Sequence, residues 1–179
     1  PAPPRPRSAL PLAAVSGGRG SLGAFPSGAV SAVASGLEEG DVSRWTAPLP
    51  WPYTEDDARQ WIGSHEQQRR KGATLNLAIT EGGGEALGAI GLQGFEWDAR
   101  RALVGYWMGR PWRNRGLTTR ALILLSDWAM GTLEPDRLQL FTITDNVASE
   151  RVAAKAGFHI VGAIPTKDIG STRAHHAIG

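Results

Sequence analysis

Residues 75–109 carry three strand-like runs that are joined by connections of only a few residues. The first run, TLNLAIT, has a large apolar residue at every second position, which is typical of a half-buried strand. The sequence EGGGE predicts a turn into a second strand over residues 85–97, and residues 98–100 predict a turn into a third strand over residues 102–109. Connections this short leave no room for a crossover, so neighbouring strands must be antiparallel. The middle of the chain therefore predicts an antiparallel meander.

The hydrophobic period changes from that of a strand to that of a helix after residue 116. Apolar residues then recur at helical spacing and predict a buried stripe formed by Leu117, Ala121, Leu124, Leu125 and Trp128. A strand over residues 137–143, a helix over 146–156 and a strand over 159–165 follow. This order predicts an α+β fold, with a mixed, mostly antiparallel central sheet, one β-α-β crossover and flanking helices.

Capping residues mark the start of two helices. Thr54 precedes an acidic run with Asp57 three positions later, which resembles a capping box. The helix over 146–156 is predicted to have Asp145 or Asn146 as its cap and Gly157 as its end. Its inward residues are predicted to be Ala148, Val152 and Ala156.

The first 40 residues differ from the rest of the chain. They are rich in Pro, Gly, Ala and Ser and show little periodicity. We expect a weakly patterned segment over residues 1–40, with room for a first strand and a short helix over 29–37, followed by a domain over residues 41–179. Residues 172–178 are expected to add a short last strand.

Composition and charge exclude several classes of function. The chain has no cysteine, which excludes disulfides, thiolate zinc sites and a cysteine nucleophile. Its four histidines lack metal-ligand spacing, so we expect no metal site. A net charge of +2 is too small to argue for nucleic acid, and no apolar run approaches the roughly 20 residues of a membrane helix. We therefore expect a cytoplasmic protein that binds neither nucleic acid nor membranes.

The stretch RNRGLTT joins the third strand to the first long helix. A helix start exposes unpaired N–H groups and attracts anions. Gly116 lets an anion approach the backbone, Arg113 and Arg115 add positive charge, and Thr118 and Thr119 add hydroxyl donors. This set suits a pyrophosphate better than a single carboxylate. The alternative is a basic loop with an ordinary helix cap.

Four motifs in the same order resemble the GNAT N-acetyltransferase superfamily, and its RimJ/RimL branch of ribosomal-protein-alanine acetyltransferases in particular. The resemblance covers residues 45–165. R-x-x-G-x-T starts at Arg113 and is similar to the family's Q/R-x-x-G-x-G/A loop, and N-x-x-S…K-x-G-F starts at Asn146. GYWM at 105–108 and WPYTEDDARQWI at 51–62 resemble the branch's fourth strand and its substrate-side helix.

The resemblance implies a GNAT-like fold with acetyl-CoA as cosubstrate. In that family the fourth strand splays from the fifth, the pantetheine arm lies between them, and the basic loop cradles the diphosphate. The residues implied to bind the cosubstrate are Trp107, Met108, Gly109, Arg113, Arg115, Gly116, Leu117, Thr118, Thr119, Asn146 and Ser149.

The implied activity is transfer of the acetyl group to a primary amine by direct attack in a ternary complex. The family places an oxyanion donor near the backbone N–H of Met108, and the branch uses the serine of N-x-x-S, here Ser149, near the departing thiolate. Glu96 is the nearest candidate for a general base, because Leu103 stands where the branch usually has an acidic residue. A solvated glutamate with a relay of waters, and a plain capping role for Ser149, are the alternatives.

The amine acceptor is implied to be a protein N-terminus or a small molecule. Aromatic residues that could line its pocket are Trp51, Tyr53 and Tyr106, although aromatics at such spacing are mostly core residues. Homodimers are common in the family. A non-catalytic acyl-CoA binder stays open as an alternative, since Ala153 stands where many GNAT enzymes carry a tyrosine and Thr118 where they carry a smaller residue.

Overall fold

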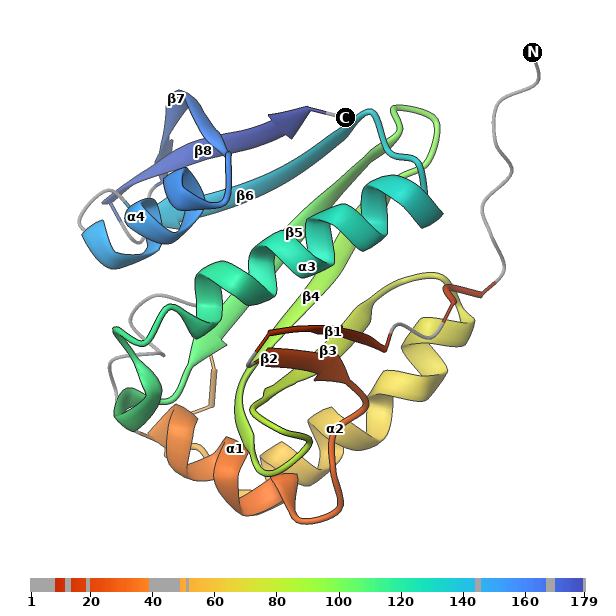
Figure 1. The fold of residues 1–179 in the computed structure, drawn as a ribbon, viewed down its shortest axis with the longest axis vertical. Helices are drawn as coiled ribbons and strands as arrows, with labels where there is room; N and C mark the ends of the chain where they lie inside the picture. The colour runs from red at the N-terminus through yellow and green to blue at the C-terminus, as the bar shows by residue number, and fades with distance from the viewer. Residues whose placement is uncertain are drawn as a thin grey trace.

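The computed structural model describes residues 9–11, 14–18, 20–38, 49–50, 52–143, 146–166 and 170–178. Its strands form one sheet in the order β1-β2-β3-β4-β5-β6-β8-β7 (Figure 1). The strands are β1 (Val15–Gly17), β2 (Gly20–Gly23), β3 (Leu75–Thr80), β4 (Ala86–Glu96), β5 (Arg101–Met108), β6 (Arg137–Ile143), β7 (His159–Thr166) and β8 (Gly170–Ile178). The helices are α1 (Ala29–Glu38), α2 (Glu55–Arg70), α3 (Leu117–Thr132) and α4 (Val147–Lys155), with a short 3-10 helix at Arg110–Trp112.

The predicted meander is confirmed. β3 pairs with β4 and β4 with β5, both antiparallel, in a register that places Leu77 opposite Ile90 and Ile90 opposite Tyr106. α3 then crosses over to β6, which pairs with β5 in parallel. The predicted α+β architecture, a mostly antiparallel sheet with a β-α-β crossover from β5 through α3 to β6, is therefore correct. A second connection of this kind joins β6 through α4 to β7, with β8 between the two strands.

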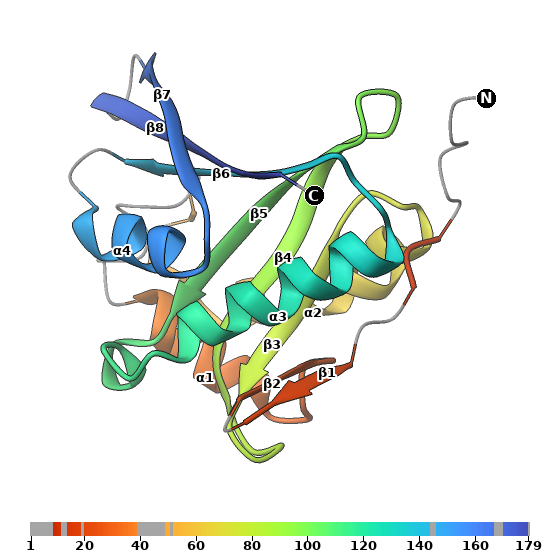
Figure 2. The ribbon, with the colours of Figure 1, turned by 45° about the horizontal axis from the view of Figure 1, so that its top comes forward.

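β5 and β6 are joined at one end only. Among the described residues their pairing is limited to residues 101–103 against residues 137–139. Beyond these pairs the two strands diverge, and α4 lies on the diverging side (Figures 1 and 2). Residues 104–108, which we call the outer edge of β5, thus have a neighbouring strand, β4, on one side.

Arg100 fastens the joined end. It lies in the β4–β5 turn at φ 49°, and its carbonyl accepts hydrogen bonds from the N–H groups of Asp136 at 2.8 Å and Arg137 at 3.2 Å. Its Nε also forms an ion pair with Asp136 at 2.8 Å. Because these contacts tie the hairpin to the loop before β6, the two strands start together and separate only afterwards.

The helices cover both faces of the sheet. α3 and α4 pack over the main core, whereas α1 and α2 pack on the opposite face of β3 and β4. This second cover corrects the prediction of a half-buried β3, because Ala78 and Thr80 on its other face are also buried.

The buried stripe of α3 is wider than predicted. Leu117, Ala121 and Leu125 are buried as expected, but Leu122 and Ala129 are buried as well, and Leu124 and Trp128 are only partly buried. Leu124 packs against β1, where a Cβ at Gly17 would come within 2.7 Å of its side chain. The contacts of α3 with β1 and β2 explain why its buried surface exceeds one stripe.

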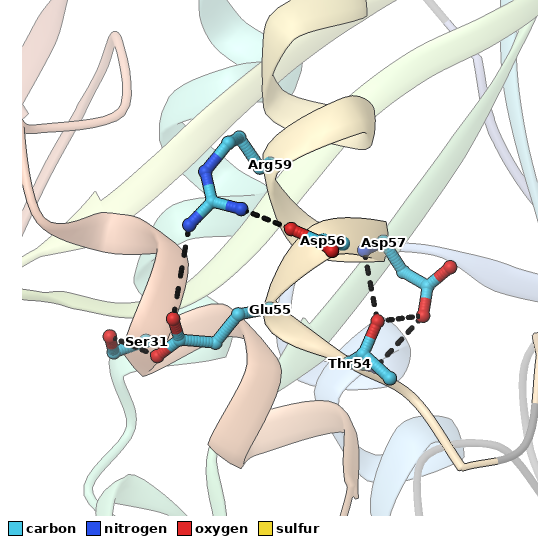
Figure 3. A network of polar contacts seen from close by, with 6 residues as sticks. All are labelled: Ser31, Thr54, Glu55, Asp56, Asp57 and Arg59. Carbon is cyan, nitrogen blue, oxygen red and sulfur yellow. Dashed lines mark hydrogen bonds and ion pairs between the residues drawn. The ribbon is translucent and has the colours of Figure 1, made fainter.

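The N-terminal segment contributes two strands and a helix. β1 and β2 extend the sheet beyond β3, and the helix expected over 29–37 is present as α1. Ser31 of α1 donates a hydrogen bond of 2.5 Å to Glu55, the first residue of α2 (Figure 3). The domain boundary predicted at residue 41 lies outside the described residues and stays a prediction.

The C-terminal half corrects one of the three inward residues predicted for α4, Ala148. Asn146 is its N-cap, as one alternative predicted, and Asp145 lies outside the described residues. Ala148 is exposed, whereas Ser149, Val152, Ala153 and Ala156 lie on the inward side. β8 is the expected last strand, starts two residues earlier than predicted, and lies between β6 and β7.

The start of α2 depends on the predicted capping box (Figure 3). Thr54 Oγ1 accepts the Asp57 N–H at 3.2 Å, while Asp57 accepts the Thr54 N–H at 2.8 Å and the Thr54 hydroxyl at 2.5 Å. We predict that Thr54→Ala lowers the free energy of unfolding by about 1 kcal/mol at pH 7, and that Thr54→Ser, which keeps the hydroxyl, has a much smaller effect. Equal losses in urea unfolding would contradict this assignment.

The same contacts predict a dependence on pH. The hydrogen bonds from Thr54 hold the pKa of Asp57 below its ordinary value of 3.8. A lowered carboxyl pKa contributes stability that is present above the unfolded-state pKa and is lost as the pH falls through the folded-state pKa. The difference in stability between the wild type and Thr54→Ala should therefore shrink as the pH is lowered from 5 towards about 2, measured by urea unfolding at each pH.

Gly88 allows β4 and β5 to approach at the far end of the outer edge, opposite Met108. A Cβ at this position would lie 2.4 Å from the backbone oxygen of Trp107, which the ladder holds in place. We predict that Gly88→Ala costs about 1–3 kcal/mol of stability. Gly23→Ala is the matched control, because that strand glycine has open space around it, and it should change stability by less than about 0.5 kcal/mol. A loss of similar size in both variants would contradict the steric explanation.

Candidate functional site

The first turn of α3 presents unpaired backbone donors. Gly116 is the N-cap, lies in the left-handed region at φ 73°, and provides no side chain to cap the helix. The first helical hydrogen bond runs from the Arg120 N–H to the Gly116 carbonyl at 3.1 Å. The N–H groups of the three residues between them, Leu117, Thr118 and Thr119, therefore have no acceptor within the helix. Leu117 is buried and anchors this turn in the core.

Three arginines surround this turn. Arg113 Nε donates to the Met108 carbonyl at 3.0 Å, which folds the loop back onto β5. Arg115 lies over the Trp112 ring, 5.2 Å from its centroid, and forms an ion pair of 2.9 Å with Glu81. Arg120 donates to the Arg115 carbonyl at 3.3 Å.

Sequence reasoning missed Arg120, Glu81 and Trp112 at this loop. The sequence could have indicated Arg120, because a residue four positions after Gly116 lies on the same side of the helix as Gly116. Glu81 carried none, since its turn between β3 and β4 is 34 residues away from Arg115. Three guanidinium groups and one carboxylate give the loop a net positive charge and make it suited to an anion.

The backbone of the outer edge of β5 alternates in direction. The Gly109 N–H donates to the Leu87 carbonyl at 2.9 Å, which makes this a hydrogen-bonded pair of the antiparallel ladder. Since such pairs alternate, residue 107 and the N–H of residue 109 are directed to β4, and residues 106 and 108 direct their backbone groups away from it. Of the predicted backbone contacts, Met108 thus faces the diverging side. Trp107 and the Gly109 N–H are used in the ladder, and the Gly109 carbonyl accepts the Trp112 N–H at 3.0 Å.

Side chains also alternate along β5. Tyr106 faces the main core under α3 and α4, and Trp107 packs in the cluster under α1 and α2, where a Cβ at Gly36 would lie 2.8 Å from its ring. The two neighbouring aromatic residues therefore serve opposite faces of the sheet.

Tyr106 connects β5 to α4. Its hydroxyl lies 2.8 Å from Ser149 Oγ and donates to the Ser149 carbonyl at 3.2 Å. Asn146 Oδ1 accepts the Ser149 N–H at 3.1 Å, so the predicted pair Asn146 and Ser149 forms the first turn of α4. This cap uses the side-chain oxygen of Asn146, whereas a contact with a pantetheine carbonyl would use its amide nitrogen.

Burial raises the pKa of Tyr106 to about 12, and the hydrogen bond with Ser149 acts in the opposite direction. The phenol is therefore neutral at physiological pH and carries one hydrogen that it can donate. The structure thus brings Met108, Ser149, Asn146 and Tyr106 together on the diverging side of β5.

Glu96 does not join this group. It lies at the other end of β4, six residues beyond Ile90, the partner of Tyr106, which corresponds to roughly 20 Å along the strand. Its carboxylate forms an ion pair with Arg101 at the joined end of β5 and β6. This position argues against Glu96 as the general base, because the hairpin that carries it points away from Met108, and the identity of the base stays a prediction.

The aromatic residues predicted to line an acceptor pocket are not on one surface. Tyr53 is 6% exposed and packs with Val33 and Leu37 in the cluster under α1 and α2. Burial, followed by the charge of Asp57, raises the pKa of Tyr53. Tyr106 faces α4 instead, and Trp51 lies outside the described residues.

Among the residues that the structure describes, none of the helices is long and apolar enough to cross a membrane. Within the same residues, no group of three or more His, Cys, Asp or Glu side chains could hold a metal ion.

Known proteins resemble the chain in both sequence and fold. YjcK of Bacillus subtilis (strain 168), described as a probable N-acetyltransferase, is 28% identical over 112 residues, which is 62% of each chain. RimJ of Mycobacterium smegmatis, solved with CoA-disulfide, superimposes with a TM-score of 0.80 at 18% identity, over 93% of this chain and 86% of RimJ. The microcin C7 self-immunity acetyltransferase MccE, solved with acetyl-CoA and AMP, gives a TM-score of 0.78 at 17% identity, over 90% and 93% of the two chains.

The expected similarity to the RimJ/RimL branch is thus confirmed for the fold. The model of the acetyltransferase (GNAT) domain matches residues 29–159. This match spans most of the chain and includes β5, the basic loop, α3 and α4, and the protein therefore belongs to the GNAT family of acetyltransferases.

Proposed function

We propose that the protein transfers the acetyl group of acetyl-CoA to a primary amine, either a protein N-terminus or a small-molecule amine, by direct attack in a ternary complex. Family membership supports the reaction class, and YjcK is described as a probable N-acetyltransferase. MccE was solved with acetyl-CoA, and RimJ with a CoA-disulfide.

The observation that carries the proposal is the first turn of α3. Three backbone N–H groups without helical acceptors, with no side chain at the N-cap, form a binding site for a diphosphate. Arg115 and Arg120 supply charge beside it, and Thr118 and Thr119 are half-buried donors at its edge. Arg113 contributes through the Met108 carbonyl, by which it fixes the loop against β5.

The remaining groups suit thioester chemistry. Attack of the amine nitrogen forms the C–N bond and places negative charge on the carbonyl oxygen, for which the Met108 N–H is a preorganised donor. Collapse of this intermediate breaks the C–S bond, and Ser149 can then donate a hydrogen bond to the thiolate. The backbone direction of residue 108 and the position of Ser149 at the start of α4 support these two roles.

A dedicated general base is not required for an α-amino acceptor. Such a group has a reference pKa of about 8, so roughly a tenth of it is neutral at pH 7. A relay of waters can take the remaining proton once the C–N bond has formed. Neither the acceptor, a homodimer nor a cytoplasmic location follows from the described residues, and these stay predictions.

A non-catalytic acyl-CoA binder is the second candidate, because Ala153 stands where many GNAT enzymes carry a tyrosine and Leu103 where the branch usually has an acidic residue. The two candidates differ in one measurement. We expect the protein to release free CoA thiol from acetyl-CoA faster when a peptide or small-molecule primary amine is present, with stoichiometric N-acetyl product by mass spectrometry. The rate should rise with pH up to about 8, as the amine loses its proton. Binding of acetyl-CoA by calorimetry without any such product would favour the binder.

The diphosphate site predicts a selective binding defect. Arg115→Ala should weaken CoA binding by roughly tenfold in calorimetry, because one charge-assisted contact is lost. The same variant should not change the affinity for pantetheine, which lacks the diphosphate. Arg70→Ala is the control for net charge, since Arg70 is an exposed residue at the end of α2 and pairs with Glu66. Equal effects of the two substitutions, or weaker binding of pantetheine by Arg115→Ala, would contradict a contact with the diphosphate.

A further inference from the structure

We propose that Tyr106 is a positioning residue for the acyl-transfer step. Its hydroxyl holds Ser149 Oγ beside the outer edge of β5, so that the serine hydroxyl can donate a hydrogen bond to the departing thiolate. This inference rests on the proposed function. It assigns Tyr106 to the leaving-group side of the reaction, whereas the sequence pattern placed this residue in the acceptor pocket.

The position of the two residues supports this role. Tyr106 lies three residues beyond Leu103, the last residue of β5 that pairs with β6, and Ser149 lies in the first turn of α4. The phenol therefore links the two structural elements that flank the diverging side. Met108, two residues further along β5, directs its backbone in the same direction, which places the Tyr106–Ser149 pair beside the proposed oxyanion donor.

The heavy-atom geometry allows two arrangements of hydrogens. In the first, Tyr106 donates to the Ser149 carbonyl at 3.2 Å, and the Ser149 hydroxyl donates to the phenol oxygen at 2.8 Å. In the second, Tyr106 donates to Ser149 Oγ across the same 2.8 Å, and the serine hydrogen is available to another acceptor. No heavy atom has to move between the two, because hydroxyl hydrogens rotate freely.

The first arrangement satisfies both hydroxyls when no acceptor is near. A thiolate that forms beside Ser149 favours the second, because a charged acceptor makes a stronger hydrogen bond than a neutral one. Tyr106 then donates a hydrogen bond to Ser149 Oγ, and Ser149 donates one to the sulfur, so the two hydroxyls form a chain of hydrogen bonds that ends on the thiolate. Such chains strengthen each member by polarisation.

The phenol acts through a hydrogen bond, without losing its proton. Burial raises the pKa of Tyr106 to about 12, whereas an ordinary thiol has a pKa of about 8.5. A complete transfer of the proton from the phenol to the thiolate would therefore be uphill. The O–H bonds of Tyr106 and Ser149 both stay intact, and the thiolate takes its proton from water or from the acylated ammonium after the C–S bond has broken.

A purely structural role makes a different prediction. If the hydroxyl of Tyr106 only anchored α4, its loss would lower stability and disturb substrate binding whether or not Ser149 carries a hydroxyl. If Tyr106 acts through Ser149 Oγ, its loss has no effect on the thiol once that oxygen is gone. The two roles are separated by a double-mutant cycle of Tyr106→Phe, which keeps the ring in the core, with Ser149→Ala.

The experiment follows the thiol of bound CoA, so it does not depend on turnover. The protein is saturated with CoA, and the ultraviolet absorbance of the thiolate is titrated with pH in the wild type, both single variants and the double variant. In the wild type the thiol of bound CoA should titrate at a lower pH than the thiol of free CoA. In Tyr106→Phe the midpoint of this titration should rise by about one pH unit. In the Ser149→Ala background, Tyr106→Phe should cause no further shift. Where an amine is acetylated, kcat should fall about tenfold in Tyr106→Phe, with little change in the dissociation constant of CoA.

Two outcomes would overturn this inference and leave the proposed function standing. The first is a thiol midpoint that Tyr106→Phe does not change, and the second is a shift of equal size with and without the Ser149 hydroxyl. A thermal melt of each variant shows whether the fold is intact, and Tyr106→Phe that binds CoA with wild-type affinity is informative in either case. Failure of the wild type to acetylate any amine would overturn the proposed function, while the thiol titration still decides the role of Tyr106. Failure to bind CoA would overturn both.

Discussion

The short pairing between β5 and β6 is the constraint on which the site depends. The strands share three residue pairs, and Arg100 ties the turn before β5 to the loop before β6. Because the strands then separate, no strand of the described residues lies beside the backbone groups of residues 106 and 108 on the diverging side of β5. A longer ladder would use these groups internally and would bring α4 too close to β5 for a substrate. The joined end is thus as important to the chemistry as the diverging end.

Local sequence signals predicted most of the fold and one part of the site. The alternation in TLNLAIT, the capping box at Thr54 and the three-residue spacing from Asn146 to Ser149 act over a few positions, where spacing determines geometry. The helical pattern placed Val152 and Ala156 correctly on the inward side of α4 but misplaced Ala148, because spacing alone fits Ala148 on that side as well as Ser149 and Ala153. Packing against the main core decides between them, and packing involves residues far away in the sequence.

Contacts across long sequence separations could not be predicted. Tyr106 and Ser149 are 43 residues apart, and Glu81 and Arg115 are 34 apart, so neither pair is visible in any local pattern. Glu96 shows that closeness in sequence can also mislead. It is close in sequence to the third strand, but a hairpin places it opposite Arg101, at the wrong end of the strand. In an antiparallel hairpin, a residue beside the turn pairs with the start of the next strand and is therefore far from the end of that strand.

Adjacent residues of β5 pack on opposite faces of the sheet. Trp107 packs under α1 and α2, and Tyr106 reaches α4, so one strand positions both helical layers. Met108 then adds a backbone donor on the same side as Tyr106 and accepts Arg113, which connects the strand to the basic loop. A shift of β5 by one residue would exchange the two faces and move every one of these groups at once. The close contact at Gly88, which allows β4 to hold β5 in register, is therefore a condition for the geometry at Ser149, although Gly88 belongs to a different strand.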